Sequence, residues 1–138
     1  MRYLLDTNVI IALIKATPTT IRERFNSEQK KGSTYFISSI VIFELWYGIF
    51  RSARREDNAQ SLAGFLSGPV SLLPPFDEED ARFAAELRAD MDSIGRPIGD
   101  YDLLIAGQAL RHKLTLVSAN AKEFGRVKNL SWEDWSKP

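Results

Sequence analysis

The chain has 138 residues, 44% of them hydrophobic and 26% charged, so it is long enough to bury a core and has the composition of an ordinary globular protein. Eighteen basic residues balance eighteen acidic ones, which excludes a protein that binds nucleic acid mainly through its overall charge. There is no cysteine, so disulfides, zinc–thiolate sites and thiol nucleophiles are excluded.

The first half of the chain is predicted to alternate between short strands and helices. In chain order these segments are a strand at residues 3–5, a helix with apolar Val9, Ile10, Leu13 and Ile14, a helix from a Thr17 cap to Gly32, a strand at 34–37, an apolar helix at 40–50 and a polar helix at 56–65. Because the helix at 40–50 is apolar on nearly every side, we expect it to be buried, with Trp46, Tyr47 and Phe50 in the core. If some of these aromatic residues are exposed instead, they would form a groove for a partner helix.

The second half continues the same alternation. Its segments are a strand at residues 70–73, a helix capped by Asp77 that carries Phe83, Leu87, Met91 and Ile94, a loop at 95–99, a helix starting at Asp100, a strand at 114–117 and a fifth short strand at 130–132. The pattern predicts one α/β domain over residues 1–138, a three-layer α/β/α sandwich around a mainly parallel sheet of four to five strands. In such folds ligands bind outside the carboxyl ends of the strands.

The ends and the apolar runs of the chain indicate its location. Asp6 lies too close to Met1 for a secretory signal to be expected. The longest apolar run, residues 37–50, is interrupted by Glu44 and Gly48 and is too short to span a membrane. We therefore expect a cytoplasmic protein with no membrane association.

Most acidic residues have a structural explanation. Glu78, Glu79 and Asp80 enrich the N-terminus of a helix, where the helix dipole favours negative charge. Glu28 and several other acids fit solvated helix faces, and His112 fits the surface at a helix end.

Asp6 and Glu44 are different because apolar residues surround them. Asp6 stands where a buried strand ends and a buried helix begins, so it either caps that helix or belongs to a site. Glu44 lies in an almost wholly apolar helix, where an unpaired carboxylate would cost several kcal/mol. Glu44 therefore requires a cation, a proton or a hydrogen-bond partner, and a structural ion pair with an arginine is the alternative to a functional site.

Asp100 and Asp102 open the next candidate helix, directly before an apolar run. One of them is enough to cap the helix, and Asp102 is the stronger site candidate because its neighbours belong to the core. The fold would project Asp6, Glu44 and Asp102 toward one edge of the sheet, where like charges repel unless a cation neutralises them. Mg²⁺ suits such a cluster because it takes oxygen ligands and keeps several waters.

Several motifs, in order along nearly the whole chain, support a resemblance. They are Leu5-Asp6-Thr7-Asn8, Ser38-Ser39 followed by Glu44-Leu45-Trp46-Tyr47-Gly48, Ile98-Gly99-Asp100-Tyr101-Asp102, Leu116-Val117-Ser118-Ala119-Asn120, and the ending Val127-Lys128-Asn129-Leu130-Ser131-Trp132-Glu133-Asp134-Trp135. This combination resembles PIN-domain ribonucleases, and among them VapC-type toxins of type II toxin–antitoxin systems.

The resemblance implies roles for particular residues. The family's three metal-binding acids fall on Asp6, Glu44 and Asp102, which are also the implied catalytic residues. Thr7 and Asn8 match positions that brace the first acid, and Ser118 matches a hydroxyl at the rim of the site; Asn120 stands where many relatives carry a fourth acid, so it and Asp100 are the remaining candidate ligands, with Glu123 as a further acid that could compensate.

The resemblance also implies an activity and partners. It implies a Mg²⁺-dependent endoribonuclease, with Mn²⁺ able to substitute, that cleaves structured RNA, forms a homodimer and is bound by a VapB-like antitoxin. Because the net charge is zero, RNA must be attracted locally, and Arg96 and Arg51 are the candidate contacts. The alternatives are a non-enzymatic PIN-like module that binds a protein partner, and a metal-dependent DNA nuclease or phosphatase.

Overall fold

The computed structural model describes the backbone of residues 1–138 and every side chain except that of Ala121. Strands and helices alternate along most of the chain, as the sequence predicts. In order they are β1 (Arg2–Leu5), α1 (Thr7–Lys15), α2 (Thr19–Lys30), β2 (Thr34–Ile37), α3 (Ser39–Arg51), α4 (Arg55–Leu66), β3 (Ser71–Leu72), α5 (Glu78–Ser93), α6 (Asp100–His112), β4 (Thr115–Val117), α7 (Ala121–Phe124) and β5 (Trp132–Glu133).

The strands form one sheet in the order β3-β2-β1-β4-β5, and every neighbouring pair is parallel. The register places Leu5 at the end of β1 beside Val117 at the end of β4. Because the strands are parallel, the residues that follow them, Asp6 and Ser118, emerge side by side at the same edge of the sheet.

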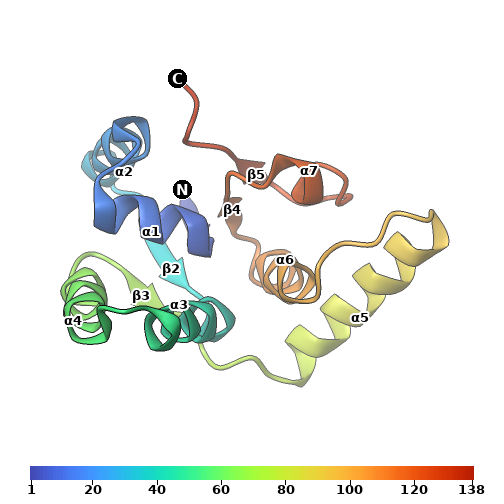
Figure 1. The fold of residues 1–138 in the computed structure, drawn as a ribbon. Coiled ribbons are helices and arrows are strands. Elements are labelled where there is room, and N and C mark those ends of the chain that lie inside the picture. Colours follow the sequence, from blue (N-terminus) through green and yellow to red (C-terminus); the bar gives the residue numbers. More distant parts are fainter.

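Helices cover both faces of the sheet. Helices α1, α2 and α4 lie on one side, and α5, α6 and α7 lie on the other (Figure 1). This arrangement follows from the strand order, since the chain first moves outward from β1 to β3 and then returns past β1 to β4 and β5. The predicted three-layer α/β/α fold is confirmed.

The central strands are buried on both faces. Leu4 and Leu5 of β1 and Leu116 and Val117 of β4 have no exposed surface. Continuous apolar runs of this kind are typical of parallel strands covered by helices on both sides. In the part of the chain that the structure describes, no helix is both long and apolar enough to cross a bilayer.

Helices α5 and α6 approach each other closely because a glycine lies between them. An added Cβ at Gly107 of α6 would lie 2.9 Å from both the Cα and the Cβ of Ala84 in α5. No real Cβ fits at that separation, so the backbone contact between the two helices depends on Gly107.

The structure corrects two helix predictions. Helix α2 begins at Thr19 with Pro18 as its cap residue, and Thr17 does not cap it. Helix α3 is not buried on all sides, because Trp46, Tyr47 and Phe50 are 37%, 54% and 56% exposed. The buried residues of α3 are Val41, Leu45 and Ile49, which recur every four positions, and the apolar residues on its other sides obscured this spacing in the sequence.

The structure also corrects predictions for charged and polar side chains. Glu28 is buried and accepts hydrogen bonds from Tyr3 and Ser33, 3.1 and 3.0 Å long, while Arg24 pairs with it at 3.2 Å. Burial raises the pKa of Glu28, but these hydrogen bonds outweigh it and lower the pKa below its ordinary value. The side chain of His112 is mostly buried as well, so it does not belong to a solvated surface. Asp80 lies at the helix N-terminus predicted for it, but it is completely buried there.

Candidate functional site

Asp6 lies at the centre of the carboxyl edge of the sheet and is only 3% exposed. It caps α1, because its Oδ1 accepts a 2.8 Å hydrogen bond from the backbone N–H of Thr7. Its Oδ2 accepts hydrogen bonds from the Ser118 hydroxyl at 2.7 Å and from the Asn8 amide at 3.4 Å. Burial raises the pKa of Asp6, although these hydrogen bonds oppose the rise. The helix cap and the site candidate are therefore the same residue.

Glu44 projects from α3 toward the same edge. Its Oε1 accepts a 2.8 Å hydrogen bond from the hydroxyl of Thr7, so Thr7 contacts two of the predicted acids, one through its backbone and one through its side chain. Burial raises the pKa of Glu44, the Thr7 hydrogen bond lowers it, and the charge of Asp6 raises it further. The fold therefore brings these two carboxylates, 38 positions apart in the chain, close enough for the charge of one to affect the other.

Asp102 lies in the first turn of α6, and its Oδ2 accepts a 3.0 Å hydrogen bond from the Asn120 side-chain amide. Burial raises the pKa of Asp102 to about 6, and the charges of Asp6, Glu44 and Glu123 contribute to the rise. The charge of Asp6 raises the pKa of Glu44, and the charges of both raise the pKa of Asp102, which places the three acids in one electrostatic cluster.

Polar side chains join the two ends of the cluster. Ser118 donates to Asp6 and its Oγ accepts a 3.0 Å hydrogen bond from the backbone N–H of Asn120, whose amide reaches Asp102. Asn8 bonds to Asp6 with its nitrogen, and its Oδ1 accepts from the backbone N–H of Ala119 at 3.2 Å. The segment after β4 therefore connects the acid that follows β1 with the acid that begins α6.

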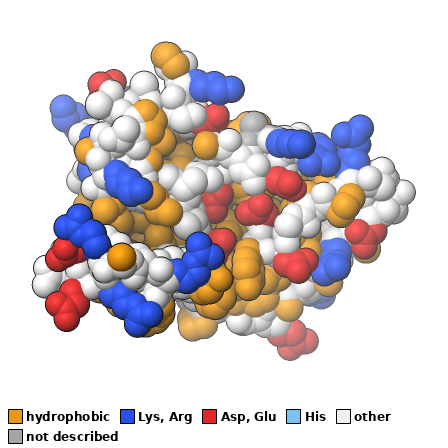
Figure 2. Space-filling view, in the orientation of Figure 1, with side chains coloured by type: hydrophobic (Ala, Val, Ile, Leu, Met, Phe, Trp, Pro, Cys, Tyr) orange, Lys and Arg blue, Asp and Glu red, His pale blue; other side chains and the backbone are white. Residues whose placement is uncertain are grey.

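No basic side chain neutralises the cluster. Among the described residues, none of Asp6, Glu44 and Asp102 forms an ion pair with lysine, arginine or histidine. Figure 2 shows acidic side chains gathered in a hollow in the middle of this face, with lysines and arginines around its margins. Carboxylates that share a site without a counter-charge favour a cation or a proton.

The carboxylates are near one another, but their oxygens are not arranged as a complete set of ligands for an ion. Among the side chains that the structure describes, no three acidic or histidine groups are arranged to hold a metal directly. Thr7, Ser118 and Asn120 each occupy one carboxylate oxygen of the cluster. An ionised carboxylate still has acceptor sites on both oxygens, so these bonds orient the acids without saturating them.

The sequence matches the family described as PIN domain over residues 3–130. The chain belongs to the PIN-domain family. It is 40% identical over 136 residues to the tRNA(fMet)-specific endonuclease VapC of Shigella flexneri, with 99% of each chain covered. It is 38% identical over 139 residues to Ribonuclease VapC2 of Rickettsia felis, with 99% of this chain and 100% of the relative covered.

Solved structures agree with this placement. The structure of VapBC2 from Rickettsia felis bound to a promoter DNA fragment has a chain that superposes with a TM-score of 0.89 at 37% identity, covering 98% of this chain and 99% of that one. DNA-bound VapBC from Salmonella typhimurium gives a TM-score of 0.87 at 38% identity, with 98% of each chain covered. These matches confirm the predicted resemblance to VapC-type PIN domains.

Three other predicted site residues lie apart from the acid cluster of this PIN domain. Asp100 is exposed and its carboxylate lies 3.7 Å from the guanidinium of Arg88 on α5. Arg96 is exposed in the loop before α6. Arg51, at the end of α3, stacks over the ring of Tyr47, with 5.0 Å between its guanidinium carbon and the ring centroid. The structure brings none of these three into the hydrogen-bond network of the acids.

A groove that the sequence pattern did not indicate begins beside Glu44. It has a volume of about 250 Å³ and runs between α1, α3 and α4. Apolar side chains make up much of its wall, and Glu44 lies among its lining residues; these include Ile11, Ile14, Leu45, Gly48, Ile49 and Leu62. Ile11 of this wall is 40% exposed on α1.

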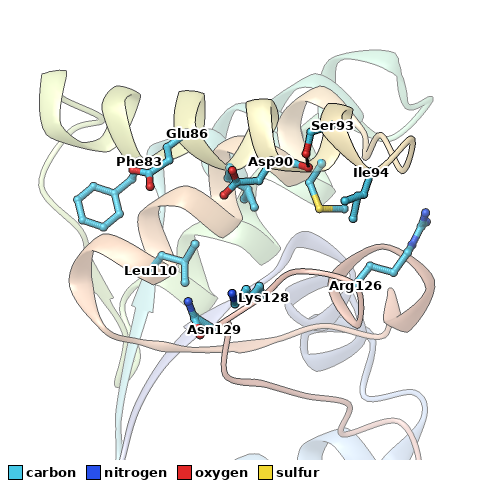
Figure 3. A pocket seen from close by; sticks show the side chains of 11 residues that line it. Phe83, Glu86, Asp90, Ser93, Ile94, Leu110, Arg126, Lys128 and Asn129 are labelled. Carbon is cyan, nitrogen blue, oxygen red and sulfur yellow. Dashed lines mark hydrogen bonds between the residues drawn. The ribbon is translucent and has the colours of Figure 1, made fainter.

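A larger hollow than this groove lies elsewhere in the described part of the chain. It measures about 610 Å³ and lies between α5, α6 and the segment at residues 126–129 (Figure 3). Glu86 and Asp90 stand on its α5 wall, and Arg126 and Lys128 come from the opposite segment. None of the clustered acids lines it, so size alone does not identify the functional site here.

Proposed function

We propose that this PIN domain is a Mg²⁺-dependent endoribonuclease that hydrolyses structured RNA and acts as the toxin of a toxin–antitoxin pair. The observation that carries the proposal is the gathering of Asp6, Glu44 and Asp102 at the carboxyl edge of the sheet without a basic partner. Relatives of nearly the same length at 38–40% identity are named endonuclease or ribonuclease, which supports the same activity.

The donor set fits Mg²⁺. All of the clustered groups offer oxygen, and Mg²⁺ binds through one or two carboxylates while keeping several waters, so it does not require three preassembled ligands. Asp6, Glu44 and Asp102 would hold the ion, directly or through its waters, and Mn²⁺ would take the same donors. Asn120 has a neutral amide at the position where many relatives have a fourth acid. Because this amide donates a hydrogen bond to Asp102, its proposed role is to orient that acid.

The chain's own residues prepare the hydrolysis. When bound, Mg²⁺ supplies positive charge to the scissile phosphate and lowers the pKa of a water. One of the three carboxylates would also accept the proton of the attacking water. The water oxygen bonds to phosphorus as the bond to the 3′ oxygen breaks and that oxygen takes up a proton, which leaves a 5′-phosphate and a 3′-hydroxyl. Thr7 and Ser118 hold the carboxylates of Glu44 and Asp6 in place.

RNA would be held by local contacts, since the net charge is zero. Arg96, in the loop that leads into α6, and Arg51, at the end of α3, are proposed to contact the RNA backbone. Phosphate contacts of this kind position the nucleic acid without reading its sequence.

Protein partners fit two surfaces beside the site. The groove between α1, α3 and α4 is proposed to receive a segment of a VapB-like antitoxin, which would then lie next to Glu44 and cover the acids. Exposed aromatic rings next to it are proposed as part of a homodimer contact: Phe43 lies 6.3 Å from Tyr47 and 5.3 Å from Tyr101, measured between ring centroids.

The activity is tested by incubating the purified protein with RNA and with DNA of the same sequence, in Mg²⁺ and in EDTA. Initiator tRNA is the first substrate to use, because the relative from Shigella flexneri is named for it. We expect Mg²⁺-dependent cleavage of RNA by the wild type and none by Asp6→Asn. Intact RNA in every lane would support a non-enzymatic binding module, and preferential cleavage of DNA would support a DNA nuclease.

A further inference from the structure

A second polar chain joins the two helices that carry Glu44 and Asp102, beneath the acid cluster. The Ser38 hydroxyl, at the end of β2, donates a hydrogen bond to the Oε1 of Gln108 in α6. Both side chains have no exposed surface. A buried amide of this kind persists only where its donors and acceptors have partners, so its contacts fix its position.

The other end of Gln108 is anchored to α5. Its Nε2 donates to Oδ2 of Asp80 at 3.4 Å, and Asp80 is completely buried. Oδ1 of Asp80 pairs with Arg111 at 3.0 Å, and Oδ2 accepts a 3.0 Å hydrogen bond from the backbone N–H of Asp77 to complete the capping box of α5. Gln108 therefore connects Ser38 to a rigid ion-paired helix start.

The connection lies at matching places on the two helices. Ser38 caps α3 by accepting a 3.0 Å hydrogen bond from the N–H of Ile40, and Glu44 follows it by six residues. Asp102 precedes Gln108 by six residues on α6. Six residues span about 9 Å of helix, so a shift at the Ser38–Gln108 bond moves both carboxylates relative to each other.

We propose that Gln108 is a positioning residue that sets the separation of Glu44 and Asp102, and through it the affinity of the site for a divalent cation. This inference rests on the proposed metal-dependent function. Gln108 contacts none of the three acids in the hydrogen-bond network of the described side chains, so it acts only by fixing α3 against α6.

The test compares Gln108→Met, which keeps much of the volume and removes both hydrogen bonds, with Tyr35→Phe. The control removes another buried hydrogen bond, from the Tyr35 hydroxyl in β2 to the carbonyl of Phe25 in α2. Mn²⁺ binding is measured without RNA by electron paramagnetic resonance, and the unfolding midpoint is measured in urea. Measuring binding separately from cleavage distinguishes this inference from the proposed function, since a wild type that binds Mn²⁺ but leaves RNA intact would contradict only the latter.

We expect Gln108→Met to raise the Kd for Mn²⁺ about tenfold, as the loss of a supporting residue does at metal sites, while Tyr35→Phe changes stability alone. Ser38→Ala breaks the same contact from the α3 side and should weaken Mn²⁺ binding in the same direction; it decides the question if Gln108→Met does not fold. A wild-type Kd in a folded Gln108→Met or Ser38→Ala protein, or an equal loss in Tyr35→Phe, overturns the proposal.

Discussion

At the scale of single residues, Asp102 illustrates the conflict between stability and function. Its pKa rises from an ordinary value of 3.8 to about 6, first because it is buried and then because Asp6 and Glu44 are charged. Between these two pKa values the folded protein holds a proton on Asp102 that the unfolded chain releases. The contribution of the protonated Asp102 to the free energy of unfolding is therefore fully present below pH 3.8 and is lost as the pH rises through 6. Above pH 6 the ionised Asp102 destabilises the metal-free fold.

Replacing Asp102 should accordingly stabilise the protein while it abolishes cleavage. We expect Asp102→Asn to raise the free energy of unfolding by about 1 kcal/mol at pH 8 in EDTA, a figure reduced for the partial exposure of the group, with the gain vanishing toward pH 4. Saturating Mg²⁺ should stabilise the wild type and leave the variant unchanged.

Asp100→Asn is the matched control on the same helix, since Asp100 is exposed beside Arg88. It should leave both stability and cleavage near the wild-type values. Equal urea midpoints for Asp102→Asn and the wild type at pH 8 would contradict the electrostatic account of the site.

At the scale of helices, α6, which carries Asp102, is held in place by close packing against α5. Gly107→Ala should destabilise the fold by about 1–3 kcal/mol, because the new Cβ would overlap Ala84 and push the helices apart. Gly64→Ala on α4, where an added Cβ meets nothing within 4 Å, should instead gain about 0.5–1 kcal/mol from helix propensity. Urea unfolding of the two variants measures the difference, and a Gly107→Ala protein as stable as the wild type would show that α5 can move away freely.

The positions of two of the acids could be predicted from the sequence because each lies at or near the end of a recognisable element. Asp6 follows a strand and Asp102 lies in the first turn of a helix, so the fold class alone predicts that both lie at one edge of the sheet. Glu44 could be singled out because it is charged within an apolar helix.

The buried polar side chains could not be predicted in this way. Glu28, Asp80 and Gln108 each lie on a helix and bond to a side chain from a distant segment. Glu28 bonds to Tyr3, Asp80 to Gln108, and Gln108 to Ser38. Hydrophobic periodicity shows only the average polarity of a helix face. A charged residue is therefore predicted to be exposed to solvent unless its bonding partner is known. The exposed aromatic face of α3 could not be predicted either, because the helix has no stripe of polar residues to mark the side that faces solvent.

At the scale of the whole molecule, the groove proposed to receive the antitoxin lies beside Glu44, one of the proposed metal-binding acids. Gly48→Gln places a long side chain into this groove from a position where nothing lies within 4 Å, so the domain itself should gain about 0.5–1 kcal/mol from helix propensity. Binding of the cognate antitoxin, measured by calorimetry, should weaken at least about tenfold because the groove is filled, and RNA cleavage should persist. Gly64→Gln makes the same change on α4 outside the groove and should leave antitoxin binding intact; equal affinities for both variants would contradict this placement of the antitoxin.

Anomalous scattering from a Mn²⁺-soaked crystal would show whether side chains from the β1–α1 junction, α3 and α6 hold one catalytic cation. The account predicts a peak between Asp6 and Asp102, with Glu44 bound to it directly or through a water, and its loss in Asp6→Asn. No peak at this edge of the sheet, or a peak that survives in Asp6→Asn, would contradict it.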